Sequence, residues 1–122
     1  MTTSDFYLHV TSLPLLQGIS AENILQMQER GALRVVSMEP EEGNIIQQGQ
    51  YCHTLTMLME GTLTCTTYGA DWILEEEVRS PAIIEEEALW SLSQSYNHTY
   101  TPTTEGRLLV IDRRHVMQTM LH

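Results

Sequence analysis

Residues able to bind a ligand or a metal gather in two neighbouring stretches of the chain. They are Glu85, Glu86, Glu87, Ala88, Leu89 and Trp90, followed by Tyr96, Asn97, His98 and Thr99. The three successive carboxylates have the chemistry to ligate a divalent cation together with His98 or His53. Successive acidic residues more often form a solvated helix start, where they interact favourably with the helix dipole. We therefore expect no metal and no cofactor here.

The histidines and aromatic residues of these stretches fit a structural role. His53 and His98 are isolated, and the sequence contains no His-x-His or His-x-x-x-His pair. We therefore expect surface or half-buried imidazoles. Trp90 and Tyr96 are able to stack on an aromatic ligand, but aromatic side chains at such positions usually fill a core. Core packing is the prediction for both.

The charge balance argues against one class of partner. Sixteen Asp and Glu residues against six Lys and Arg give a formal net charge of −10, so this stretch repels nucleic acid. Cys52 and Cys65 are too few for a disulfide framework and lack the spacing of a zinc site. We expect two reduced thiols, with a single bridge as the alternative.

Length and hydropathy set the class of the protein. The 122 residues suit one domain spanning 1–122. The sequence shows no basic-then-apolar leader and no apolar run near the ~20 residues that cross a bilayer. We therefore expect a cytoplasmic protein without a membrane partner.

The elements that must position these residues are short strands punctuated by glycine. Gly43, Gly49 and Gly61 each interrupt an apolar or β-branched run where the chain has to turn, and glycine reaches positive φ without steric cost. Strands are expected near residues 32–38, 45–46, 54–59, 62–68, 72–74, 99–104 and 107–111. Such a series predicts a mainly β fold, a double-stranded β-helix or jelly-roll barrel of about eight short strands with flanking short helices.

Helical periodicity appears only near the two ends. Ser4 and Ser20 are suited to cap two helices that end near Pro14 and Gly31. Asp112 is suited to cap a last helix, whose apolar side holds Val116, Met117, Met120 and Leu121.

Three features together resemble one family. The opening residues 13–20, the glycine spacing and the closing residues 108–112 before a helix are similar to the N-terminal sensor domain of the CRP/FNR transcriptional regulators. The resemblance implies a cyclic-nucleotide-binding-like jelly roll without catalysis. It also implies a homodimer formed through the helix after Asp112, and DNA binding only by a C-terminal helix-turn-helix domain absent from this chain. We therefore expect a piece of a longer regulator in preference to a stand-alone sensor module.

The chain departs from the family where its ligand would bind. Cyclic-nucleotide-binding members carry Gly-Glu-Leu and, some ten residues later, an arginine that holds the cyclic phosphate. Here Glu86 or Glu87 stands at the glutamate's position, the glycine has become acidic, and Tyr96 or Asn97 replaces the arginine. Burying a phosphate beside carboxylates without a cation costs several kcal/mol, so cAMP and cGMP are disfavoured. A different small-molecule effector, or a scaffold that senses nothing, is expected.

A cupin-like jelly-roll metalloenzyme is the alternative function. Cupin sites need a His-x-His with a further carboxylate and histidine on one metal. The sequence has no His-x-His, so we favour the sensor and predict no enzyme activity.

Overall fold

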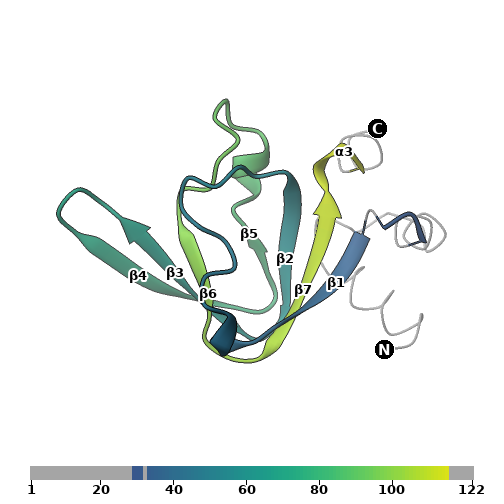
Figure 1. Cartoon of the computed structure of the whole chain (residues 1–122), viewed down its shortest axis with the longest axis horizontal. Coiled ribbons are helices and arrows are strands. Elements are labelled where there is room, and N and C mark those ends of the chain that lie inside the picture. The colour runs from purple at the N-terminus through teal and green to yellow at the C-terminus, as the bar shows by residue number, and fades with distance from the viewer. Residues whose placement is uncertain (1–28, 32, 116–122) are drawn as a thin grey trace.

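The chain is an antiparallel β-sandwich, seen here in a computed structural model that describes residues 29–31 and 33–115. Seven strands are formed within these residues (Figure 1). They are β1 (Leu33–Met38), β2 (Thr54–Glu60), β3 (Thr62–Tyr68), β4 (Ile73–Arg79), β5 (Ala82–Ile84), β6 (Thr99–Pro102) and β7 (Gly106–Asp112). The short helices are η2 (Pro40–Glu42), η3 (Glu86–Leu89) and the first turn α3 (Arg113–His115).

Two sheets form the sandwich. The first has the order β1-β7-β2-β5 and the second β4-β3-β6, with every pair antiparallel. The segment before β2 lies along β6, where Ile46 pairs with Tyr100 as an isolated bridge. A jelly-roll fold made mainly of β-strands is thus confirmed. Within the described residues, no strand is shared between the two sheets. The strand expected at residues 45–46 is reduced to that isolated bridge.

The core is a single cluster between and beside the sheets. Its fully buried side chains come mainly from β1, β2 and β7 and are Leu33, Met38, Leu55, Met57, Leu58, Leu63, Leu89, Leu109 and Ile111. Alternation holds along most of β3, where Leu63 and Cys65 are buried as predicted, whereas Thr66 is buried although alternation placed it outside. Cys52 and Cys65 are both free thiols.

The predicted turning glycines all have positive φ, at 75° for Gly43, 88° for Gly49 and 101° for Gly61. Gly61 is also confined by its neighbours, because a Cβ there would lie 2.7 Å from Met38 Cε and 2.8 Å from Glu105 O. No L side chain fits this combination of backbone angle and close packing.

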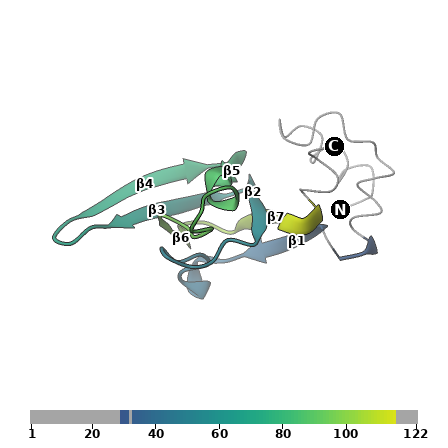
Figure 2. The same ribbon diagram turned by 90° about the horizontal axis from the view of Figure 1, so that it is seen from above.

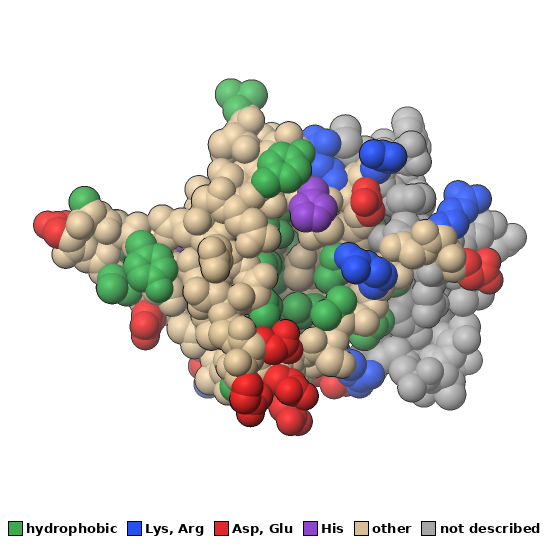
Figure 3. Space-filling model, in the orientation of Figure 1, with side chains coloured by type: hydrophobic (Ala, Val, Ile, Leu, Met, Phe, Trp, Pro, Cys, Tyr) green, Lys and Arg blue, Asp and Glu red, His purple; other side chains and the backbone are tan. Residues whose placement is uncertain are grey.

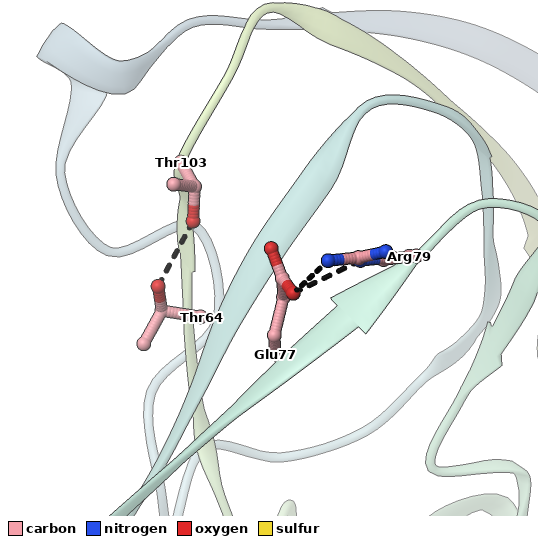
Figure 4. Close-up of polar contacts among 4 residues, drawn as sticks. All are labelled: Thr64, Glu77, Arg79 and Thr103. Carbon is pink, nitrogen blue, oxygen red and sulfur yellow. Dashed lines mark hydrogen bonds and ion pairs between the residues drawn. The ribbon is translucent and has the colours of Figure 1, made fainter.

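The β3–β4 hairpin projects from the body of the domain in both views (Figures 1 and 2). At its base, Thr64 and Thr103 share a hydroxyl hydrogen bond of 2.9 Å, and Arg79 pairs with Glu77 at 2.9 Å (Figure 4). The Arg79–Glu77 pair is solvent-exposed, so it contributes little to stability. Trp72, at the tip, is half-exposed and covers Gly69.

The first predicted N-terminal helix, the apolar stripe of the second and the apolar residues of the last helix lie outside the described residues. Gly31, predicted to end the second helix, is described and has a positive φ of 72°. In the described part of the chain, none of the helices has the length and apolar character needed to cross a bilayer.

Two leucines allow a matched test of this core. We expect Leu109→Ala, at a side chain with no exposed surface, to lower the free energy of unfolding by about 2–5 kcal/mol through the cavity it leaves. Leu92→Ala, at a fully exposed side chain, should change it by less than about 0.5 kcal/mol. Denaturant unfolding measures both, and equal effects would contradict the described packing.

Candidate ligand-binding site

Glu85 occupies a special backbone position at the entry to the predicted site. It lies between the end of β5 and the start of η3, with φ 40° and ψ 59°, in the left-handed region. A non-glycine residue pays a steric penalty of about 1–2 kcal/mol there. The side chain is also buried, with 7% of its surface exposed. Compensating contacts must therefore hold it.

Both carboxylate oxygens of Glu85 accept hydrogen bonds. The backbone N–H of Asn97 donates to Oε1 at 2.7 Å, and the hydroxyl of Tyr100 donates to Oε2 at 3.0 Å. Such charge-assisted bonds are roughly twice as strong as neutral ones, and they offset the cost of burying the carboxylate. Glu85 thus joins the segment after β5 to the start of β6.

The buried tyrosines of the site hold their protons strongly. Burial raises the pKa of Tyr100 far above its ordinary value, and the negative charge of Glu85 raises it further. Burial likewise raises the pKa of Tyr96, with its neighbour Cys52 adding to the shift. Burial is also the main reason that the pKa of Cys65 is raised. In this environment both tyrosines act as neutral hydrogen-bonding groups.

The structure places the other predicted site residues in different surroundings. Ala88, Leu89, Tyr96 and Thr99 are buried, Glu86 and His98 are half-buried, and Glu87, Trp90 and Asn97 are exposed. The Nδ1 atom of His98 lies 2.6 Å from the hydroxyl of Thr67, and the hydroxyl of Thr99 accepts from the Gln48 N–H at 3.0 Å. Ala88 and Leu89 are each 1% exposed and belong to the core cluster.

Two predictions about these residues are wrong. A solvated helix start does not describe Glu85, because its carboxylate satisfies the Asn97 amide and the Tyr100 hydroxyl inside the domain. Core packing does not describe Trp90, which ends η3 with 43% of its surface exposed. Core packing is confirmed for Tyr96, which is 3% exposed.

Sequence reasoning missed two residues that complete the site. Tyr100 is one; it lies in the strand predicted at residues 99–104, and no spacing in that run distinguished it from its neighbours. Arg113, at the start of α3, is the other: its Nε donates to the Leu89 carbonyl at 3.2 Å and its backbone N–H to the His53 carbonyl at 2.9 Å. With the Gln94 amide oxygen turned toward it, Arg113 Nε also donates there at 2.9 Å. Arg113 therefore connects η3 and the segment after it with α3, which we call the exit helix.

The site offers no donor set for a metal in the described residues. No three His, Cys, Asp or Glu side chains there lie close enough together to hold an ion. His53 is exposed, with its ring parallel to that of Tyr51 at a centroid distance of 6.1 Å.

Comparison with solved structures shows what this arrangement is similar to. A cAMP-independent protein kinase A regulatory subunit from Trypanosoma brucei, in a mutant bound to cAMP, superposes with a TM-score of 0.78 at 20% identity, over 97% of this chain and 43% of that chain. The sensor domain of the transcriptional regulator DNR from Pseudomonas aeruginosa gives a TM-score of 0.74 at 17% identity, over 93% and 79%. A transcriptional regulator from Thermotoga maritima gives 0.65 at 16% identity, over 78% and 73%.

These likenesses establish the fold. The chain has the architecture shared by cAMP-binding regulatory domains and the sensor domains of transcriptional regulators. It spans less than half of the kinase regulatory chain. No protein-family model matches the sequence, and no curated protein matches it at a significant level.

The protonation of Tyr100 gives a pH prediction. Tyrosine in an unfolded chain ionises near pH ~10, whereas folded Tyr100 keeps its proton to much higher pH. The stability that this difference contributes is fully present below pH ~10 and is lost as the pH rises above it. Above pH ~10, the free energy of unfolding should fall about 1.4 kcal/mol per pH unit more steeply in the native protein than in Tyr100→Phe.

The exposed Tyr51 supplies the control for this measurement. Tyr51→Phe should leave the alkaline fall of the free energy of unfolding as steep as it is in the native protein. Denaturant unfolding between mildly and strongly alkaline pH measures the slopes, and identical slopes for the native protein and Tyr100→Phe would contradict the assignment.

Proposed function

We propose that this chain is the effector-sensing and dimerisation domain of a CRP/FNR-like transcription regulator, and that it binds neither cAMP nor cGMP. The proposal that the chain does not bind cyclic nucleotides rests on the Glu85 carboxylate, which accepts hydrogen bonds from the Asn97 N–H and the Tyr100 O–H. The resemblance implies a glycine just before the conserved glutamate, and the left-handed backbone of Glu85 suits that glycine's place. Glu86 then stands where the glutamate would be.

A cyclic phosphate is rejected in this proposal on electrostatic grounds. The donors that an anion would use are already paired with an internal anion. Two like charges about 4 Å apart repel by about 4 kcal/mol at the effective dielectric constant of a protein surface. Residues 85–99 contain no Lys or Arg to offset that repulsion.

The T. brucei neighbour supports the same requirement. It is described as cAMP-independent, and among the substitutions of its cAMP-bound mutant one replaces threonine with arginine. An added cation thus accompanies cAMP binding in that protein. Among the described residues the Arg113 guanidinium contacts this region, and it already donates to the Leu89 carbonyl.

Effector sensing needs a route to the rest of a regulator, and Arg113 supplies one. Any shift of η3 alters the contact between Leu89 O and the first turn of α3. In this proposal the helix after Asp112 carries the shift to a homodimer interface, and a following helix-turn-helix domain binds DNA in the cytoplasm. The candidate effector contacts are the non-core members of the predicted set, chiefly Glu86, Trp90 and Asn97. No group of described residues favours the cupin-like metalloenzyme.

The nucleotide prediction is tested by titration calorimetry and thermal shift. We expect no heat and no rise in melting temperature with millimolar cAMP or cGMP. In Glu85→Gly/Asn97→Arg the internal carboxylate is gone and a cation is present, so we expect measurable cAMP binding. Glu85→Gly alone separates the effect of the lost carboxylate from that of the added cation. Saturable binding of cAMP by the native chain would overturn the proposal that it rejects cyclic nucleotides.

The role of Arg113 is tested by hydrogen exchange. Arg113→Gln removes the guanidinium that donates to Leu89 O, so backbone amides of residues 88–94 should exchange several-fold faster. Arg114→Gln is the control, because Arg114 is exposed and its hydrogen bond to the Asp112 carboxylate is donated by its backbone N–H. Unchanged exchange in Arg113→Gln would show that this contact does not couple the two segments.

A further inference from the structure

A cavity lies apart from the carboxylate of Glu85. It has a volume of about 350 Å³ and opens between the first sheet and the segment 44–53. Figure 3 shows a hollow with hydrophobic side chains on its floor, with a histidine and Lys or Arg side chains along its rim and acidic side chains below. The volume falls in the range of small-molecule sites. Of the predicted site residues only Tyr96 lines it.

The floor of the cavity is set by strand register. Arg34, Val110 and Thr56 lie in one row across β1, β7 and β2, and Val36 lies beside Leu108 in the next row. These side chains share one face of the sheet because alternate residues of a strand point to the same side. Leu109 and Ile111 point to the opposite face and are fully buried.

The cover comes from the segment 44–53. Ile45 and Ile46 contribute apolar walls, and their backbones are fixed by hydrogen bonds with Tyr100 of 2.9 Å each, from Ile45 N–H and to Ile46 O. Further along, Gly49 N–H donates to Tyr96 O at 2.8 Å and Tyr96 N–H donates to Gln50 O at 2.9 Å. The cover is therefore bonded at both ends to the strand and loop beside it. The cavity is preformed.

The cavity is electrically polarised along its length. Arg34, on β1, and His53, just before β2, lie at the end near Val110 and Thr54. Glu42 follows the other end of β1, beyond Met38. Arg34 and Met38 lie four positions apart along the strand, a distance of about 13 Å. The Arg34 guanidinium makes no ion pair or hydrogen bond to another described residue.

We propose that this cavity binds a small carboxylic acid with an apolar body. The carboxylate lies against Arg34 at the His53 end, and the apolar body lies over Val36 and Leu108 under Ile45. An apolar wall beside the cation lowers the local dielectric constant and strengthens the pairing. A free amino acid fits less well, because its amine and carboxylate are adjacent while the two charged ends of the cavity are far apart.

Occupancy of this cavity reaches the exit helix by a short path. His53 lies on the rim, and its backbone carbonyl accepts a hydrogen bond of 2.9 Å from the backbone N–H of Arg113. A carboxylate bound at the Arg34 end would therefore lie near His53, which is hydrogen-bonded to the first residue of α3. The inference goes beyond the proposed function and does not depend on the rejection of cyclic nucleotides.

The test uses octanoate, with 1-octanol and octylamine as probes of the same body and different head groups. Titration by calorimetry and by chemical-shift perturbation in NMR should show octanoate binding at least tenfold more tightly than either. Arg34→Gln should weaken octanoate about tenfold, the loss of roughly one charge-assisted bond, and leave octanol unchanged. Arg79→Gln, on the exposed hairpin, is the matched control and should change nothing.

Location is tested by filling the cavity. Val36→Phe places a larger side chain over the floor and should abolish octanoate binding while the melting temperature stays close to that of the native protein. Failure of octanoate to bind at millimolar concentration would overturn the proposal. Equal affinity for octanol, or an unaltered affinity in Arg34→Gln, would overturn the carboxylate class, and undiminished binding in Val36→Phe would overturn the site.

Discussion

The structure around the candidate site depends on one buried carboxylate. Glu85 sits in a left-handed turn and accepts one bond from the backbone of Asn97 and one from the hydroxyl of Tyr100. Without it, the turn after β5 would lack its connection to the start of β6, and a buried hydroxyl would lose its acceptor. The same contacts position η3 so that Leu89 enters the core and its carbonyl meets Arg113. A single side chain thus organises the candidate site.

The residues around Glu85 and the cavity near Arg34 meet at Tyr96. Tyr96 belongs to the predicted site and also lines the cavity, and its backbone pairs with the cover segment. Both regions contact Arg113, one through Leu89 and the other through His53. Under the two proposals, occupancy at either place would reach the first turn of α3, which would then convert binding into a mechanical change.

Much of the fold was predictable from local chemistry, and the site was predictable only in part. The turns at Gly43, Gly49 and Gly61 were predictable because a positive φ is a property of a single residue. The strands β3 and β7 were predictable from their residue composition. The burial of Glu85 was not predictable, because its two hydrogen-bond donors lie 12 and 15 positions further along the chain. The cavity near Arg34 was missed for the same reason, since its floor exists only when β1 pairs with β7.

The projecting hairpin has a consequence for how the protein behaves in a crowded solution. β4 is the edge strand of its sheet, and Ile73 and Leu74 at its tip are half-exposed or more. An apolar edge with free backbone groups is a template on which another chain can add a strand and begin to aggregate. Glu75, Glu76 and Glu77 follow at once along that edge. The negative charges of two copies of β4 would repel each other, so this edge disfavours strand pairing between two copies of the chain.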